Sequence, residues 1–230
     1  MAIDRHINFF ELQKACAAPG CPLCRIAAAR ADRYIDNMLF EHVSDRSFRA
    51  HHRAAGGFCP FHARNLESFR DGLAVAILGR DILEDRLAHF KQRKPWKPVR
   101  RCPVCEERDR IEEEYLTFLI EAGAGSENTA ALQTFFTASD GLCIPHYGKL
   151  LEYAAPRPWH KPVRIPRWLT DFHEARFEKL LERTGRFIEL SAYGRQDEFA
   201  ALSERDQTVW KELALTIRGD AEPAARAAII

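Results

Sequence analysis

The chain has 230 residues, of which 46% are hydrophobic and 29% are charged, and its formal net charge is +1. This composition is ordinary for a globular protein with an apolar core, and any strongly charged surface on it must be local. The sequence contains no apolar run long enough for a membrane-spanning helix and begins without a secretory signal. We therefore expect a cytoplasmic protein that does not insert into membranes.

Cysteine is the most informative residue type in the chain. The sequence has seven cysteines, an odd number, and four of them form C-x-x-C pairs. In a chain without an export signal, this indicates reduced thiols that bind metal, not a framework of disulfides. The four motifs are CPLC from Cys21, CPFH from Cys59, CPVC from Cys102 and CIPH from Cys143. The seventh cysteine, Cys16, has no counterpart in the second half and is expected to be a structural or free thiol.

The two halves of the chain repeat one another. Each half contains a C-P-x-C motif, which is followed at a similar interval by a glycine, an apolar residue and C-x-x-H. Tyr34 and Tyr115 occupy matching positions between the motifs. We infer an internal duplication, with a first metal-binding unit at residues 16–90 and a second at residues 98–155.

Helices are expected between the paired motifs and in the C-terminal part. In the second unit, apolar residues recur with helical spacing at Ile111, Tyr115, Phe118, Leu119 and Ala122. Residues 168–219 predict two more helices, the second of which starts at Ser203 and ends at Gly219. The sequence thus predicts an all-α protein made of two pseudo-repeated helical hairpins, each closed by a Cys3His metal site, plus a C-terminal helical pair.

Three thiolates and one imidazole form a tetrahedral zinc-binding set. The predicted ligands are Cys21, Cys24, Cys59 and His62 in the first unit, and Cys102, Cys105, Cys143 and His146 in the second. Proline within each C-P-x-C motif restricts the turn, and Gly57 and Gly141 permit a close approach of the backbone. The sequence leaves open whether the motifs combine within or across the two units, and whether they form a binuclear centre.

Two other chemistries use the same residue types. An iron–sulfur cluster is an alternative, because histidine can replace cysteine as a cluster ligand. Thiol–disulfide exchange is another, because a helix start can depress a thiol pKa. The chain lacks the compact cysteine run of bacterial ferredoxins and a strand before either C-P-x-C motif. Zinc is therefore the favoured cofactor, with two sites.

Signatures of catalysis are missing from the sequence, which contains no serine-hydrolase, P-loop, dinucleotide-binding or zinc-protease motif. The acidic run Glu112–Glu114 is expected to be a solvated helix face. His51 and His52 are expected to lie in an exposed polar loop, and His173 is expected to be a surface or core histidine. We therefore expect no catalytic residues.

Two proline-containing connectors, at 91–101 and 157–168, combine basic residues with tryptophan. The candidate residues of the first are Arg93, Lys94, Trp96, Lys97, Arg100 and Arg101. Such a segment could bind nucleic acid or an acidic protein. The alternative is a solvated linker whose tryptophan packs on a neighbouring helix.

The tandem sequence CPLC…GFCPFH…CPVC…GLCIPH, within residues 21–150, resembles an uncharacterised bacterial family of unknown function. The resemblance implies a bacterial metal-binding protein and adds no catalytic residue. Our leading hypothesis is a non-enzymatic, zinc-stabilised module that binds a protein or nucleic acid. The alternative is an iron–sulfur protein with a redox or cluster-handling role.

Overall fold

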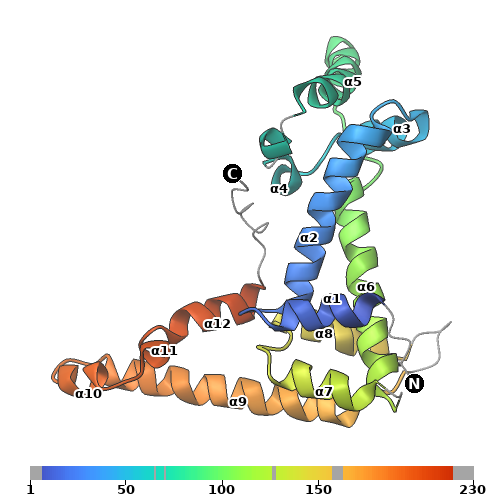
Figure 1. Ribbon diagram of the computed structural model, residues 1–230. Coiled ribbons are helices and arrows are strands. Elements are labelled where there is room, and N and C mark those ends of the chain that lie inside the picture. Colours follow the sequence, from blue (N-terminus) through green and yellow to red (C-terminus); the bar gives the residue numbers. More distant parts are fainter. Residues whose placement is uncertain (1–6, 65, 70, 126–127, 157–162, 220–230) are drawn as a thin grey trace. The chain divides into compact units, whose positions relative to one another are not determined.

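The computed structural model describes residues 7–64, 66–69, 71–125, 128–156 and 163–219 (Figure 1). All regular elements within these ranges are helical, and no strand occurs in them. The predicted all-α class is therefore confirmed. Among the described helices, none combines the length and the apolar character that crossing a membrane requires.

The chain forms two compact units. The terminal unit comprises residues 1–28 and 112–230, and the central unit comprises residues 29–111. Helices α2 (Pro22–Asn37) and α6 (Pro103–Gly123) each begin in one unit and end in the other. These structural units differ from the sequence repeats at 16–90 and 98–155, and the duplication itself stays a prediction.

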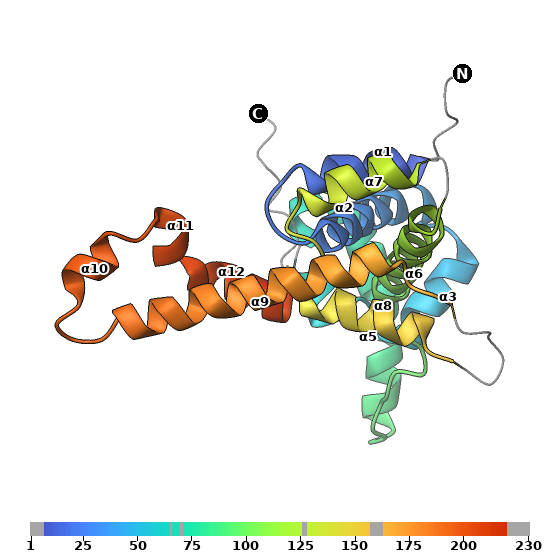
Figure 2. The ribbon, with the colours of Figure 1, turned by 90° about the horizontal axis from the view of Figure 1, so that it is seen from below.

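The terminal unit is built around helices that bury aromatic and aliphatic side chains. Its helices, besides parts of α2 and α6, are α1 (Ile7–Cys16), α7 (Thr129–Thr137), α8 (Ile144–Ala154), α9 (Arg167–Leu190), α10 (Gln196–Ala200), α11 (Glu204–Gln207) and α12 (Val209–Arg218). Helix α1 packs along α7, and α12 packs on both α8 and α9 (Figure 2). Phe9, Tyr115, Phe136 and Leu150 are completely buried in its core.

The central unit has a smaller core. Besides parts of α2 and α6, it contains a π-helical turn (Met38–His42), α3 (Arg46–Ala55), α4 (Pro60–Ala63), a 3-10 turn (Leu66–Phe69) and α5 (Gly72–Lys91). Ile35, Leu78 and Val104 are buried together there. Arg49 of α3 donates to the buried carboxylate of Asp81 on α5 at 2.6 and 2.7 Å, which ties these two helices together.

The predicted helical patterns match the observed helices well. Ile111, Tyr115 and Leu119 of the predicted stripe are fully buried on α6. Ser203 caps α11 by accepting a hydrogen bond from the backbone N–H of Asp206, and Gly219 ends α12. The C-terminal segment differs from the predicted helical pair in two respects. The short helix α10 precedes Ser203, and the single helix expected after Ser203 is interrupted between α11 and α12.

The prediction of an exposed loop at His51 and His52 is wrong. Both residues lie in α3, whose first turn is capped by the Asp45 carboxylate. His52 is buried and packs against the rings of Phe48 and Phe58. Burial lowers the pKa of His52 to about 4, so this histidine is a neutral core residue at physiological pH.

Candidate metal centres

Each of the four motifs begins a helix. Helices α2 and α6 start at the prolines that follow Cys21 and Cys102. Helices α4 and α8 have Cys59 and Cys143 as their N-caps. The two caps have nearly the same backbone conformation, with φ −64° and ψ 161° at Cys59 and φ −70° and ψ 165° at Cys143. The second donor of every motif therefore projects from the first helical turn. The positive end of a helix macrodipole favours anionic thiolates at this position.

The eight donors form two groups of four, in which all donor atoms lie within 4.8 Å of one another. The first centre comprises Cys21, Cys24, Cys143 and His146, and the second centre comprises Cys59, His62, Cys102 and Cys105. Each centre lies within one unit, the first in the terminal unit and the second in the central unit. The prediction of two Cys3His groups is confirmed. The expectation that each sequence repeat closes its own group is wrong, since each centre combines motifs from both repeats.

Helix lengths explain this exchange of motifs. From Cys21, α2 carries the chain through 16 residues, about 24 Å, whereas the following α3 has 10 residues, about 15 Å. In the second repeat, α6 has 21 residues, about 32 Å, and α7 has 9 residues, about 14 Å. The helix that follows is thus shorter than the first helix in both repeats, so it spans less distance along the chain. The two motifs of each repeat fall in different units, and each meets a motif of the other repeat.

The donor distances in the first centre suit a single tetrahedral ion. With usual zinc bond lengths, sulfur atoms on one ion lie about 3.8 Å apart, and sulfur lies about 3.6 Å from nitrogen. The Cys24 and Cys143 sulfur atoms are 3.7 Å apart. Nδ1 of His146 lies 3.4, 3.3 and 3.2 Å from the sulfur atoms of Cys21, Cys24 and Cys143. The donor set therefore fits zinc in both chemistry and spacing.

The second centre has the same geometry. The Cys59 and Cys105 sulfur atoms are 3.7 Å apart. Nδ1 of His62 lies 3.2 Å from the sulfur of Cys59, 3.6 Å from that of Cys102 and 3.5 Å from that of Cys105. Both centres thus present three sulfur atoms and an Nδ1 nitrogen to one point. Cys16 belongs to neither group, and burial raises the pKa of its thiol to about 12.

A buried carboxylate supports the histidine of the first centre. Oε1 of Glu112 lies 3.3 Å from Nε2 of His146, and Oε2 of the same carboxylate accepts a hydrogen bond from Lys149. Although burial opposes ionisation, these two partners lower the pKa of Glu112 to about 2. A carboxylate in this position fixes the ring orientation of a metal-binding histidine and raises its basicity. The expectation that Glu112–Glu114 is a wholly solvated helix face is therefore wrong at Glu112, which is 4% exposed.

Two residues outside the motifs position the first centre. Nε2 of His173 accepts a hydrogen bond from the backbone N–H of Leu142, next to Cys143, at 2.9 Å, while its Nδ1 donates to the Leu169 carbonyl. Gly219 lies against two of the sulfur atoms. A Cβ atom at this position would be 3.2 Å from Sγ of Cys143 and 3.3 Å from Sγ of Cys24. The sequence marked Gly219 as a helix end and gave no sign of its contact with the centre.

The second centre is more exposed and has different surroundings. Cys59 and Cys105 are partly exposed, whereas all four donors of the first centre are buried. Nε2 of His62 is buried and has no hydrogen-bond partner among the described residues. Burial, together with the charge of Arg108, lowers the pKa of His62 to about 4. The imidazole is therefore neutral and ready to bind a cation at physiological pH.

The connector residues remain on the surface, apart from the tryptophan. Arg93, Lys94, Lys97 and Arg100 are exposed. The guanidinium of Arg86 on α5 stacks on the Trp96 ring, with Cζ 2.9 Å from the ring centroid. This packing on a neighbouring helix agrees with the alternative prediction of a linker. Arg101 is paired with Asp109 at 2.6 Å. In the second connector, residues 157–162 lie outside the described part of the chain, and Trp168 donates to the Gly123 carbonyl at 3.0 Å.

Comparison with known proteins gives one relative and no activity. A protein of Caldicellulosiruptor sp. (strain Rt8B.4), named as an uncharacterized 23.9 kDa protein in the xynA 3′ region, is 29% identical to this chain over 188 residues. The alignment covers 75% of this chain and 83% of that protein. No protein-family model and no solved structure matches the chain. These findings agree with the resemblance to an uncharacterised family.

Proposed function

We propose that the chain is a zinc-stabilised helical protein that acts as a non-enzymatic interaction module. The observation that carries the proposal is the pair of Cys3His groups with tetrahedral donor spacing. Zinc with four protein ligands has no open position for substrate or water, so it contributes folding energy and not catalysis. The donors of each centre come from two helix starts, and a zinc ion bound there would hold those helices together.

The donor spacing supports one ion per centre over an iron–sulfur cluster. An iron–sulfur cluster places several iron and sulfide ions between its protein ligands, so some ligand atoms must be widely separated. Here all four donor atoms of each group lie within 4.8 Å of one another, which is too close for a cluster. A single tetrahedral ion needs the shorter distances seen here. The iron–sulfur hypothesis therefore has less support than zinc.

Metal analysis of the purified protein tests the cofactor assignment. Protein prepared without oxygen is expected to be colourless and to contain two zinc ions per chain by elemental analysis, without acid-labile sulfide. A brown protein with broad visible absorption and stoichiometric iron and sulfide would overturn the zinc assignment. A red protein that contains iron but no sulfide would change the assignment from zinc to a single iron ion bound by the same donors.

The interaction role is proposed to use the first connector. Its exposed cations, Arg93, Lys94, Lys97 and Arg100, would bind an anionic surface such as nucleic acid or an acidic protein. Stacking of a base on Trp96 has less support, because Arg86 covers one face of the indole. Titration with RNA, DNA and a polyglutamate peptide at two salt concentrations tests this role. Salt-dependent binding that is lost when all four cations become alanine is expected, and its absence would leave the connector as a linker.

A further inference from the structure

A cavity of about 510 Å³ lies in the terminal unit beside the first centre. Its walls come from the last residue of α1 and the following residues 17–21, residues 138–141 before α8, one residue of α9 and the α11–α12 segment. The sulfur-bearing residues Cys21 and Cys143 also line it. Its volume is within the range of about 300–1,000 Å³ that small-molecule sites occupy. No role proposed above uses this space.

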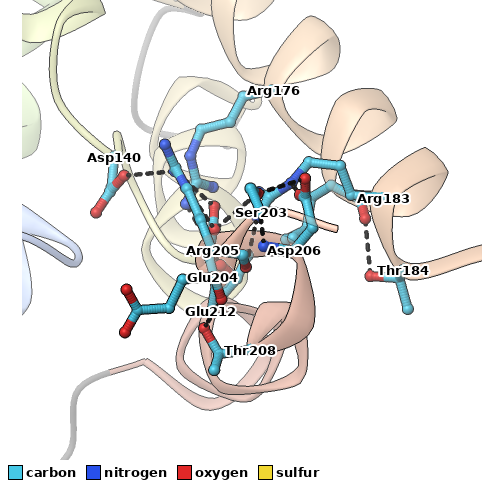
Figure 3. A network of polar contacts seen from close by, with 12 residues as sticks. Asp140, Arg176, Arg183, Thr184, Ser203, Glu204, Arg205, Asp206, Thr208 and Glu212 are labelled. Atoms are coloured by element: carbon cyan, nitrogen blue, oxygen red, sulfur yellow. Dashed lines mark hydrogen bonds and ion pairs between the residues drawn. The ribbon is translucent and has the colours of Figure 1, made fainter. Parts of the chain in front are cut away.

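The carboxylates of the cavity already have partners in the protein. Asp140 accepts a hydrogen bond from the backbone N–H of Gly20 at 2.7 Å and lies 3.6 Å from the guanidinium of Arg205. Glu212 accepts from Arg183 at 2.8 Å and pairs with Arg205 at 3.2 Å. Figure 3 shows this network, in which Arg205 lies between the two carboxylates. The negative charge of the lining is therefore balanced internally.

Two other cations of the lining form no ion pair within the described part of the chain, although the charges of Asp140 and Glu212 act on the first of them, Arg176, from a distance. Nη1 of Arg176 is buried and has no hydrogen-bond partner among the described residues, and its Nη2 reaches Oγ1 of Thr216 at a long 3.4 Å. Burial lowers the pKa of Arg176, which reflects the loss of solvent around its charge. Lys211 lies 5.4 Å from the Trp210 ring and makes no ion pair within the described part of the chain. Arg176 is thus a partly desolvated cation, which is costly unless an anion pairs with it, whereas Lys211 is exposed and free to reach an anion in the cavity.

We propose that the cavity binds a small organic anion. Its carboxylate or phosphate group would pair with Arg176 and Lys211, because a guanidinium offers several N–H donors in a plane that matches an oxyanion. Its apolar part would contact Pro19, Ala138 and Leu215, which also line the cavity. The anion adds no ligand to the metal, since the first centre already has four donors.

Calorimetric titration of the zinc-loaded full-length protein tests this site. The probes are phenyl phosphate and benzoate, which share an apolar ring and differ in the charged group, with sodium chloride at equal ionic strength as the blank. Saturable binding of at least one probe at one site per chain is expected. Lys211→Ala, a change at an exposed residue, should weaken binding about tenfold, and Arg176→Met should abolish it.

Lys179→Ala provides the matched control, because Lys179 is an exposed cation on α9 that does not line the cavity. This variant should bind the probe as the unmodified protein does. Two zinc ions per chain in every variant would show that the first centre is intact. Heats equal to those of the chloride blank for both probes would overturn the proposal. Equal weakening by Lys179→Ala and Lys211→Ala would overturn it as well, because binding would then be non-specific.

Discussion

The two centres have the same donors and the same spacing, yet they differ in everything around the donors. The first centre is buried, and its histidine contacts the Glu112 carboxylate, which Lys149 neutralises in turn. The second centre is partly exposed at Cys59 and Cys105. The charge acting on its histidine is a cation, Arg108. Equal donor sets would favour the same ion at both centres, whereas the different surroundings would give it a different affinity and a different exposure to solvent.

Removal of zinc should have the largest effect on both centres. Structural zinc supplies about 10–16 kcal/mol per site at neutral pH, so excess chelator should abolish the cooperative melting transition of each unit. The partly exposed second centre should release its ion first. Circular dichroism melting and time-resolved zinc release, measured together, test both expectations. Full retention of helix and melting temperature after both ions leave would show that the metal does not stabilise the fold.

Gly219→Ala should damage the first centre and spare the second. The backbone at Gly219, with φ 73° and ψ 167°, is unfavourable for residues with a Cβ atom, and the new Cβ would press on two sulfur atoms. We expect a loss of about 2–3 kcal/mol in the free energy of unfolding of the terminal unit. Gly148→Ala on α8 is the control, because its Cβ meets nothing within 4 Å. That change should be neutral or slightly stabilising. Equal losses in the two variants would contradict the assigned packing.

Glu112→Gln should weaken zinc binding at the first centre about 10- to 100-fold, since removal of a carboxylate behind a ligating histidine usually has this effect. The second centre should keep its affinity, because Nε2 of its His62 has no carboxylate partner in the described part of the chain. Competition with a chromophoric chelator resolves the two affinities. Glu113→Gln changes an exposed neighbour on the same helix and should alter neither. An unchanged first-centre affinity in Glu112→Gln would contradict the supporting role of the carboxylate.

His173→Gln should have a pH-dependent effect. Burial lowers the pKa of His173 to about 4, whereas an unfolded histidine titrates near about 6.5. Between these values the unfolded chain binds a proton that the folded chain does not, so the stabilising contribution of His173 falls as pH falls. The destabilisation caused by His173→Gln should therefore be smaller at pH 5 than at pH 7 by about 2 kcal/mol. Chemical denaturation at both pH values, with zinc content checked at each, measures it. A pH-independent difference would show that His173 does not stay neutral.

The sequence predicted the helices and the residues that form the two Cys3His groups because both depend on local patterns. Apolar residues at helical spacing predicted the buried face of α6, and ligand pairs with two residues between them predicted a turn that presents both side chains. Ser203 and Gly219 likewise marked real helix ends.

The sequence could not predict how the motifs combine, because this depends on the lengths of α3 and α7 compared with α2 and α6. The acidic run Glu112–Glu114 predicts a solvated helix face. Nothing in the run marks Glu112 as the carboxylate that contacts His146, because this histidine is far away in the sequence. Gly219 gives no sign of its packing role for the same reason, since the sulfur atoms beside it belong to Cys24 and Cys143, far away in the sequence. His52 differs, because its ring partners Phe48 and Phe58 are near in sequence, and the error there is the expected loop in place of α3.

The central claim is that each ion is held by motifs from both repeats. The most direct test is the zinc content of two double variants. Cys24→Ser with Cys143→Ser removes two donors of the first centre only, so the account predicts one zinc ion per chain. Cys24→Ser with Cys59→Ser removes one donor from each centre, so both should lose zinc. If the repeats instead closed their own sites, the results would be reversed, with one ion retained in the second variant and none in the first.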